Sequence, residues 1–450
     1  MRRIAFLLLA AASLLGSATA ETRPRYGGTL RIMMQAPLNS LELAAGGSTA
    51  EYWDSARLTA MIGDTLLRVD LAGRPQPGLA ESWQATGTRR GLQLTLRRGV
   101  KFHDGSPAFA EAVAHILGEK HPEWTVRSAG DTLTIESDMD RALLAAELAL
   151  PANAILKRSP DGMLLGTGPF RIADFQPGKS VKLSANEDSW AGRPFVDAIE
   201  VELGRSLRDQ AIALELGKAD VVESGPQPLI GGSPRVRTSL PVELLALVFP
   251  ENTRAQDARV REALALAVDR KPIQSALLKG AGEVTAAILP NWMTGYAPAF
   301  LTQPNVQRAR AALADSRQPA LSLSYDPRDP QAQLIAERLA LNAREAGITL
   351  QVSLSGPPDV SLVRIALPSA DPGTSLRQTA RALSLAQPLL QGATLDDLYN
   401  AERGVLEGHR IIPLLHLPVA VAAGNRVRSW QVGQAGEWNL PDVWLEPEAR

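Results

Sequence analysis

Five histidines are the first residues to consider for chemistry, because an imidazole can bind a metal ion or transfer a proton. They are His103, His115, His121, His409 and His416. His115 and Glu119 lie four residues apart on a predicted helix, with His121 close behind, so these three side chains could approach one metal ion. Without a cysteine or a second cluster of ligands, we favour the alternative, a solvated helix end, and predict no metal site.

His103 and Asp104 are adjacent and superficially resemble a catalytic base and the group that orients it. Neighbours in sequence point in different directions, however, and the following Gly105 favours a turn. We therefore predict a structural role for residues 102–105. In this interpretation Phe102 fills a core and Gly105 takes a backbone conformation that other residues resist.

The sequence lacks the motifs that most catalysis and cofactor binding require. It has no Gly-x-x-x-x-Gly-Lys-[Ser/Thr] loop, no Gly-x-Ser-x-Gly elbow and no His-Glu-x-x-His motif, and Gly280-Ala281-Gly282 lacks the third glycine of a dinucleotide fingerprint. None of the 450 residues is cysteine, which excludes thiolate catalysis, iron–sulfur clusters, cysteine-type zinc sites and a lipid-modified N-terminal cysteine. The net charge of -1 gives no basic excess for nucleic acid. We predict a protein that is not an enzyme and needs no cofactor.

Aromatic side chains offer a second kind of site, because they can form a platform for a ligand. Most of the eight tryptophans are better explained as core residues. Trp292 and Tyr296 are the exception that we single out, since they flank Thr294-Gly295 in an irregular stretch, where binding residues tend to lie. We predict that this pair contacts a ligand, with core packing as the alternative.

Hydrophobic periodicity predicts the elements that position these residues. Strands are expected where apolar residues alternate, at 92–96 and 132–135, and amphipathic helices over 257–268 and 331–346. Gly347 ends the second helix and the strand 348–352 follows, a unit typical of α/β layers. The predicted fold class is α/β.

The first twenty residues have the pattern of a secretory signal peptide. Arg2 and Arg3 precede an apolar stretch at 4–15, and Ala18-Thr19-Ala20 is a small-x-small cleavage site. The apolar stretch is shorter than the roughly 20 residues needed to span a bilayer. We expect export with cleavage after Ala20 and, since no cysteine can carry a lipid, a periplasmic location without an anchor.

Six blocks of sequence, in the same order, resemble the extracellular solute-binding proteins of family 5, the peptide- and nickel-type binding proteins of ABC importers. The most specific block runs from Leu94 to Val113 and is similar to the family signature F-x-L-R-x-G-V-K-F-H-D-G-x-P-x-x-A-E-D-V almost throughout. The other blocks lie at 27–30, 77–83, 166–170 with 186–190, 257–270 and 343–348, and the tail at 412–416 is also similar. The resemblance covers most of residues 26 to 350.

The resemblance implies a bilobal α/β fold of the periplasmic-binding-protein type, with an extra α/β subdomain and a ligand trapped between the lobes. It places the signal peptide in 1–20, lobe I in 21–48, 165–240 and 413–450, the extra subdomain in 49–164 and lobe II in 241–412. The implied function is that of a monomer that closes about a hinge on a small solute, a peptide or related compound, and delivers it to permease subunits of an ABC importer. The alternative is a family-5 scaffold that carries no cargo and acts as the partner of a periplasmic sensor.

The segment after Ile365 departs from the peptide-binding relatives. Their pattern W-x-x-D-Y-x-D-P contains a first aspartate that pairs with the α-amine of the ligand, whereas Pro368 stands at that position here. Because proline offers no counter-charge to a buried ammonium, we expect the cleft to select against ordinary free-amine peptides.

Other groups must then hold the ligand. Besides Trp292 and Tyr296, we predict contacts from Asp371, at the surviving end of the family pattern, and from Arg364 on the preceding strand. The planar guanidinium of Arg364 suits a carboxylate or phosphate-like group. The alternative for Arg364 is a salt bridge.

Overall fold

The computed structural model describes residues 23–43, 48–87, 90–226, 235–314, 320–390 and 394–447. The predicted signal peptide lies outside these residues. Within them, no helix is both long and apolar enough to cross a membrane.

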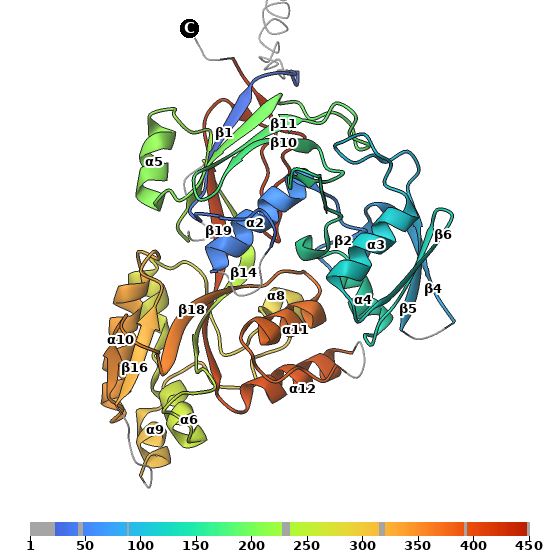
Figure 1. Cartoon of the computed structure of the whole chain (residues 1–450). Helices are drawn as coiled ribbons and strands as arrows, with labels where there is room; N and C mark the ends of the chain where they lie inside the picture. Colours follow the sequence, from blue (N-terminus) through green and yellow to red (C-terminus); the bar gives the residue numbers. More distant parts are fainter. Residues whose placement is uncertain are drawn as a thin grey trace, which may run out of the picture.

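A single sheet of eleven strands joins two lobes (Figure 1). Its order is β10-β11-β12-β1-β13-β19-β14-β18-β16-β17, with β15 paired to β19. The bilobal α/β fold predicted from the sequence is confirmed. The lobe I strands are β1 (Thr29–Met33), β10 (Phe170–Gln176), β11 (Ser180–Ala185), β12 (Ala198–Glu202) and β13 (Val221–Ser224), and the lobe II strands are β15 (Glu283–Val284), β16 (Leu321–Tyr325), β17 (Leu350–Val352) and β18 (Val360–Ala366).

Two long strands, β14 (Val236–Val248) and β19 (Ile411–Ala423), belong to both lobes. β19 pairs with β13 of lobe I at one end, and β14 pairs with β18 of lobe II at the other. Between these ends Pro241 lies opposite Pro418, and the register of the β14–β19 pair shifts on both sides of Pro241. Because proline has no N–H to donate, the ladder of hydrogen bonds is interrupted where the chain passes between the lobes.

Lobe I also contains α2 (Thr49–Ile62), α5 (Leu207–Glu215) and the short strands β20 (Val427–Arg428) and β21 (Trp444–Leu445). The sequence predicts α2 within the extra subdomain, residues 49–164. The buried side chains Leu58, Met61 and Ile62 of α2 instead pack in one cluster with Leu30 and Phe170 of the lobe I strands, so we describe α2 with lobe I. The other predicted boundaries stay a prediction.

The extra subdomain is built on a four-stranded sheet of order β4-β5-β7-β6, which lies beside the two lobes (Figure 1). It has its own apolar core, which includes Phe102, as predicted, together with Leu94 and Leu133 of the two predicted strands. Its elements are β2 (Leu67–Val69), β3 (Pro75–Pro77), β4 (Ala80–Ala85), β5 (Gly91–Leu96), α3 (Ala110–Lys120), β6 (Thr125–Ala129), β7 (Thr132–Glu136), α4 (Arg141–Glu147), η2 (Pro151–Asn153), β8 (Lys157–Arg158) and β9 (Leu164–Leu165).

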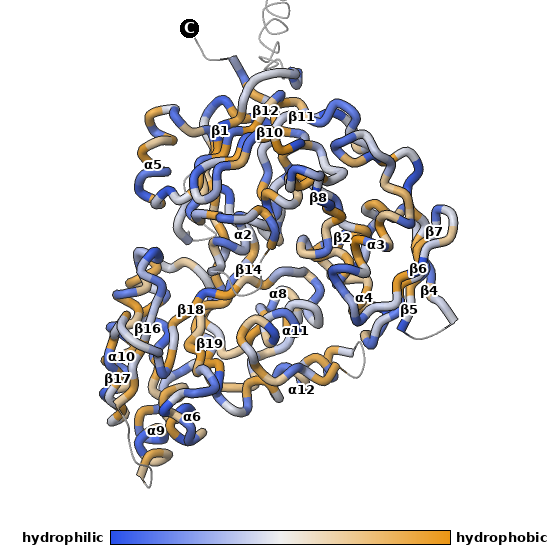
Figure 2. Tube along the Cα trace, viewed as in Figure 1, coloured by the Kyte–Doolittle hydropathy of each residue, from blue (hydrophilic) through white to orange (hydrophobic). Residues whose placement is uncertain are grey.

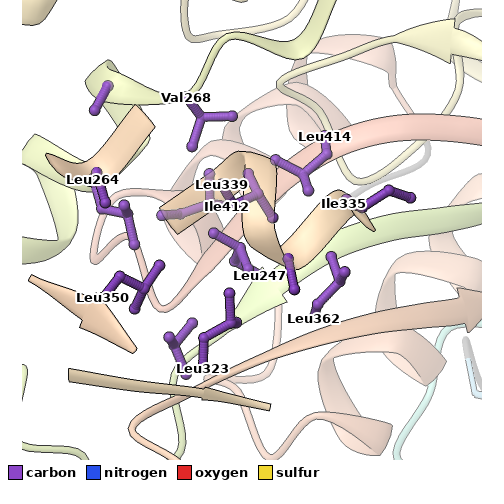
Figure 3. Packing of buried hydrophobic residues seen from close by; sticks show 14 of the residues in the cluster. Leu247, Leu264, Val268, Leu323, Ile335, Leu339, Leu350, Leu362, Ile412 and Leu414 are labelled. Atoms are coloured by element: carbon purple, nitrogen blue, oxygen red, sulfur yellow. The ribbon is translucent and has the colours of Figure 1, made fainter. Parts of the chain in front are cut away.

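Lobe II packs helices on both sides of its strands (Figure 1). Figure 3 shows the larger of its two cores, where Ile335 and Leu339 of α10 meet Leu247, Leu323 and other aliphatic side chains of the sheet. The predicted helices correspond to α6 and α10. The lobe II helices are α6 (Ala258–Ala267), α7 (Arg270–Pro272), η3 (Ile273–Leu277), α8 (Asn291–Thr294), α9 (Val306–Ala312), α10 (Ala332–Glu345), α11 (Pro372–Ala382) and α12 (Leu395–Leu406).

Hydrophobic residues gather along the strands of the central sheet, and hydrophilic residues occupy outer turns and outer helix faces (Figure 2). β19 is the clearest case, since every residue from Ile411 to Ala422 is buried. An unbroken apolar strand of this kind must be covered on both faces, which fits its place at the centre of the sheet.

Candidate functional site: the interlobe cleft

A cavity of about 1240 Å³ lies between lobe I, the extra subdomain and lobe II. Residues of separate cores form its wall, so the cavity is a cleft between folded units. Its polar lining includes Gln35, Arg57 and Glu223 from lobe I, Lys120, Glu147 and Asn153 from the subdomain, and Glu243, Asp329 and Arg364 from lobe II.

The lobe I wall is organised by Arg57 on α2. Ser48 and Glu51 form a capping box that fixes the start of this helix. One turn before its end, Arg57 Nη1 lies 2.8 Å from Glu223 Oε1 and 3.2 Å from Asp54 Oδ1, and its guanidinium stacks 4.4 Å from the Trp438 ring. Burial raises the pKa of the Asp54 carboxyl, and the charge of Glu223 adds to the rise.

The lobe II wall carries a second charged group, centred on Arg364 of β18. Arg364 Nε lies 2.7 Å from Asp329 Oδ2, and Arg364 Nη1 lies 3.6 Å from Glu243 Oε2. Burial raises the pKa of the Glu243 carboxyl, although Arg364 opposes this rise. Arg364 lines the cleft, and its guanidinium already pairs with two carboxylates.

Direct contacts join the two sides of the cleft. Thr49 Oγ1 at the start of α2 donates to the Arg364 carbonyl at 2.5 Å. The Gln35 side-chain amide donates to the Arg328 carbonyl at 3.1 Å, and Glu51 Oε1 lies 3.6 Å from Arg328 Nη1. The structure thus has the lobes in contact at the N-terminal end of α2.

The other predicted ligand residues are not part of this lining. Asp371 caps α11, where its Oδ1 accepts a hydrogen bond from the Thr374 N–H at 2.7 Å. Trp292 donates its indole N–H to the Pro241 carbonyl at 2.8 Å, next to the crossing strands. Tyr296 donates its hydroxyl to the buried Glu402 at 2.6 Å. Each of the three side chains thus has a hydrogen-bond partner within the protein. Ligand contact by them stays a prediction.

Pro368 does line the cleft. Pro368 therefore stands where an aspartate would have placed a carboxylate at the wall of the cleft. The selection against free-amine peptides stays a prediction.

The histidines weighed as metal ligands have separate partners. His115 pairs with Glu119 at 3.4 Å, and both side chains are about 70% exposed. His121 Nε2 instead bonds to Asn153 Oδ1 at 2.6 Å, and its ring stacks 3.7 Å from Trp124. Across residues 23–447, the described ranges contain no group of three or more His, Asp or Glu arranged for a metal ion.

His103 is buried and holds the subdomain to the glycine loop before β10. Its Nδ1 accepts from the Gly166 N–H at 3.3 Å, and its Nε2 lies 3.1 Å from the Gly168 carbonyl. This pair of contacts fits a neutral ring with the proton on Nε2. His103 is not among the residues that line the cleft.

We expect His103→Ala to lower the free energy of unfolding by about 1–3 kcal/mol, because it leaves the buried Gly166 N–H unpaired. The Gly168 carbonyl keeps the hydrogen bond that Asn186 donates to it. The bound fraction of solute, measured by native mass spectrometry, should stay within a few-fold of the parent. His115→Ala, at an exposed position, is the control and should change neither quantity. A large loss of solute at unchanged stability would instead place His103 in the binding site.

Sequence reasoning missed Arg57, Glu223, Glu243 and Asp329, which line the cleft. A signal was present for one of them: Glu243 is the only charged residue in the otherwise apolar run at 241–249. A carboxylate in a strand that is buried on both faces is costly unless it is paired or hydrogen-bonded, so its presence is a signal of a polar site.

The family model described as "Bacterial extracellular solute-binding proteins, family 5 Middle" matches residues 74–361. Among curated proteins, the nickel-binding protein NikA of Staphylococcus aureus is 24% identical over 68% of this chain and 67% of its own length. The peptide transport periplasmic protein SapA of Salmonella typhimurium is 24% identical over 57% of this chain. The match spans 56% of SapA, little more than half of that relative.

Solved structures show the same fold over nearly the whole chain. NikA from Staphylococcus aureus in complex with Ni(L-His)2 has a TM-score of 0.78 at 20% identity, covering 93% of this chain and 100% of that one. A dipeptide-binding protein from Pseudoalteromonas sp. SM9913 in complex with Met-Leu has a TM-score of 0.79 at 16% identity, with the same coverage. With the family model matching well over half of its residues, the chain belongs to family 5 of the bacterial extracellular solute-binding proteins.

Proposed function

We propose that this protein holds a small solute in the interlobe cleft and delivers it to the permease subunits of an ABC-type importer. The observation that carries the proposal is the cavity of about 1240 Å³ with walls from lobe I, the subdomain and lobe II. A cavity of this kind changes shape when the lobes move. A solute that contacts both lobes therefore favours the closed arrangement.

The relatives support binding rather than catalysis. NikA is named for nickel binding and SapA for peptide transport, and neither name describes an enzyme. These names favour a carrier over the scaffold that would serve only as a sensor partner. A peptide or related compound is the proposed solute class, and no cofactor is part of the proposal.

The proposed location is the periplasm. It rests on the signal-peptide pattern at 1–20 and on the absence of a cysteine that could carry a lipid anchor. We propose that the exported protein begins at Glu21 and acts as a monomer.

Ligand-linked closure is the test of this function. Native mass spectrometry of the freshly purified protein should show a solute bound to the chain. Removing that solute by unfolding and refolding should enlarge the radius of gyration in small-angle scattering. Returning it at about 100 times its Kd should add about 2.7 kcal/mol to the free energy of unfolding, since it binds only the folded state.

The comparison must use the same protein sample with and without the solute. A solute confirmed by mass, with no change in either the radius of gyration or the melting temperature, contradicts closure. Purification of an intact sensor complex with an empty cleft would favour the scaffold alternative.

A further inference from the structure

Carboxylates outnumber cations among the buried side chains of the cleft lining. The buried cations there are Arg57 and Arg364. The mostly buried carboxylates that line it are Glu147, Glu223, Glu243 and Asp329. The lining also includes Lys120, Arg328 and Arg381, but these are exposed and water screens their charges. Near the buried groups, where the dielectric is lower, the excess of carboxylates favours a positively charged occupant over an anion.

Three of these carboxylates have close partners. Glu223 lies 2.8 Å from Arg57, Asp329 lies 2.7 Å from Arg364, and Glu147 accepts two hydrogen bonds from the Gln378 amide at 2.8 and 3.0 Å. Their negative charge or their acceptor capacity is thus matched within the protein.

Glu243 differs from the other three. The residue is only 7% exposed, and its nearest cation, Arg364 Nη1, is 3.6 Å away and already held by Asp329. A second donor, the Trp53 indole N–H, also lies near its carboxylate. A buried carboxylate that shares its cation with another carboxylate is only partly compensated, so its place on the cleft wall needs an explanation.

Trp53 supplies an independent observation beside Glu243. It lines the cleft, is 8% exposed, and its indole N–H has no hydrogen-bond partner among the described residues. This N–H lies close enough to Glu243 to oppose the rise in the pKa of that carboxyl, but outside hydrogen-bonding geometry. A carboxylate that shares its counter-charge and an N–H donor without a hydrogen-bond partner therefore lie near each other on the wall.

We propose that Glu243 binds a cationic group of the solute, a protonated amine or a guanidinium, with the Trp53 N–H available to a neighbouring acceptor of the same solute. This inference rests on the proposed function and names the chemical class of its solute. Glu243 lies on β14, one of the two strands that cross between the lobes, whereas Pro368 leaves the wall near α11 without charge. A cation held at Glu243 lies next to the crossing strands and stays accessible to groups of both lobes.

The charges that face Glu243 also determine how binding depends on pH. Burial raises the pKa of its carboxyl, Arg364 of β18 and Trp53 and Arg57 of α2 oppose the rise, and Asp329 before α10 adds to it. A cation binds the ionised carboxylate, so affinity for a cationic solute should increase as pH rises through the raised pKa. Binding should release protons, which calorimetry in two buffers of different ionisation enthalpy detects.

The test is a thermal-shift screen at pH 7.5, followed by calorimetry of each compound that stabilises the protein. The cationic compounds are putrescine, spermidine, agmatine, lysine, arginine and dipeptides that contain lysine or arginine. Each is tested beside a counterpart without its positive charges, in which every amine is acetylated and a urea group, as in citrulline, replaces each guanidinium. Cationic compounds should bind and their counterparts should not. Glu243→Gln should weaken this binding by about ten-fold or more, the usual effect of losing a charged hydrogen-bond partner.

A stability measurement and one control variant separate binding from folding. Glu243→Gln should unfold at the same or a higher temperature than the parent without ligand, because it removes a buried charge. Glu251→Gln is the matched control, since Glu251 follows the same strand, has a side chain 73% exposed and lies outside the cleft lining. It should change neither affinity nor stability.

The inference is overturned if no cationic compound binds, if the compounds that bind are neutral or anionic, or if Glu243→Gln binds cationic compounds as tightly as the parent. A neutral or anionic solute found by native mass spectrometry would also overturn it. In that case the carrier function would stand, because the closure experiment accepts a solute of any charge.

Discussion

Arg57→Met should lower the free energy of unfolding by about 3–5 kcal/mol, the usual effect of removing one partner from a buried ion pair. Arg57 is almost fully buried, and its guanidinium is the cation shared by Asp54 and Glu223. Methionine keeps the length and apolar bulk against the Trp438 ring but leaves two carboxylates without a counter-charge. Urea denaturation at pH 7.5, followed by circular dichroism, measures the loss.

The design allows the charge to be separated from the packing. Arg205→Met is the control, because Arg205 pairs with Glu202 at 2.7 Å with both side chains about half exposed, where the expected effect is below about 1 kcal/mol. Adding Glu223→Gln to Arg57→Met should recover part of the lost stability, since it removes one of the unpaired charges. Equal losses in Arg57→Met and Arg205→Met would show that the buried ion pair contributes no more to the free energy of unfolding than the exposed one.

The fold could be predicted because its signals are local and numerous. The alternation at 92–96 and 132–135 and the helix–glycine–strand unit around Gly347 reflect rules that act within a few residues, and β5, β7, α10 and β17 follow them. The assignment of α2 to a lobe does not follow such a rule. The helical pattern shows that Leu58 and Ile62 share a face, but not which core that face will meet.

The cleft was harder to predict because its charged groups are brought together by the tertiary fold and not by a local sequence rule. They come from segments far apart in the chain: Arg57 and Glu223 are 166 residues apart, and Arg364 and Asp329 are 35 apart. Arg364 was identified because it lies on a strand that the resemblance placed at the cleft. Trp292 and Tyr296 were chosen for their irregular surroundings, yet that irregular stretch is ordered by hydrogen bonds to Pro241 and Glu402.

His416 makes the parent protein more sensitive to acid than a variant that cannot titrate there. Its ring is 2% exposed on β19, with Nε2 3.0 Å from the Ile288 carbonyl, and burial lowers its pKa from 6.5 to about 4. The unfolded chain takes up a proton near pH 6.5 while the folded chain does not, so stability is lost as pH falls from about 6.5 to about 4.

His416→Gln keeps an N–H donor for the Ile288 carbonyl and carries no titrating group. The stability of the parent minus that of His416→Gln should fall by about 3 kcal/mol between pH 7.5 and pH 4, at roughly 1.4 kcal/mol per pKa unit. Urea denaturation across this range measures both proteins. Taking the difference cancels buried acids such as Glu402, whose pKa is raised by burial and whose effect on stability has the opposite sign. His115→Gln, which also replaces a histidine by glutamine but at an exposed position, is the control. If the parent and His416→Gln instead lose stability in parallel, the ring binds protons equally in the folded and unfolded chains, and burial does not lower its pKa.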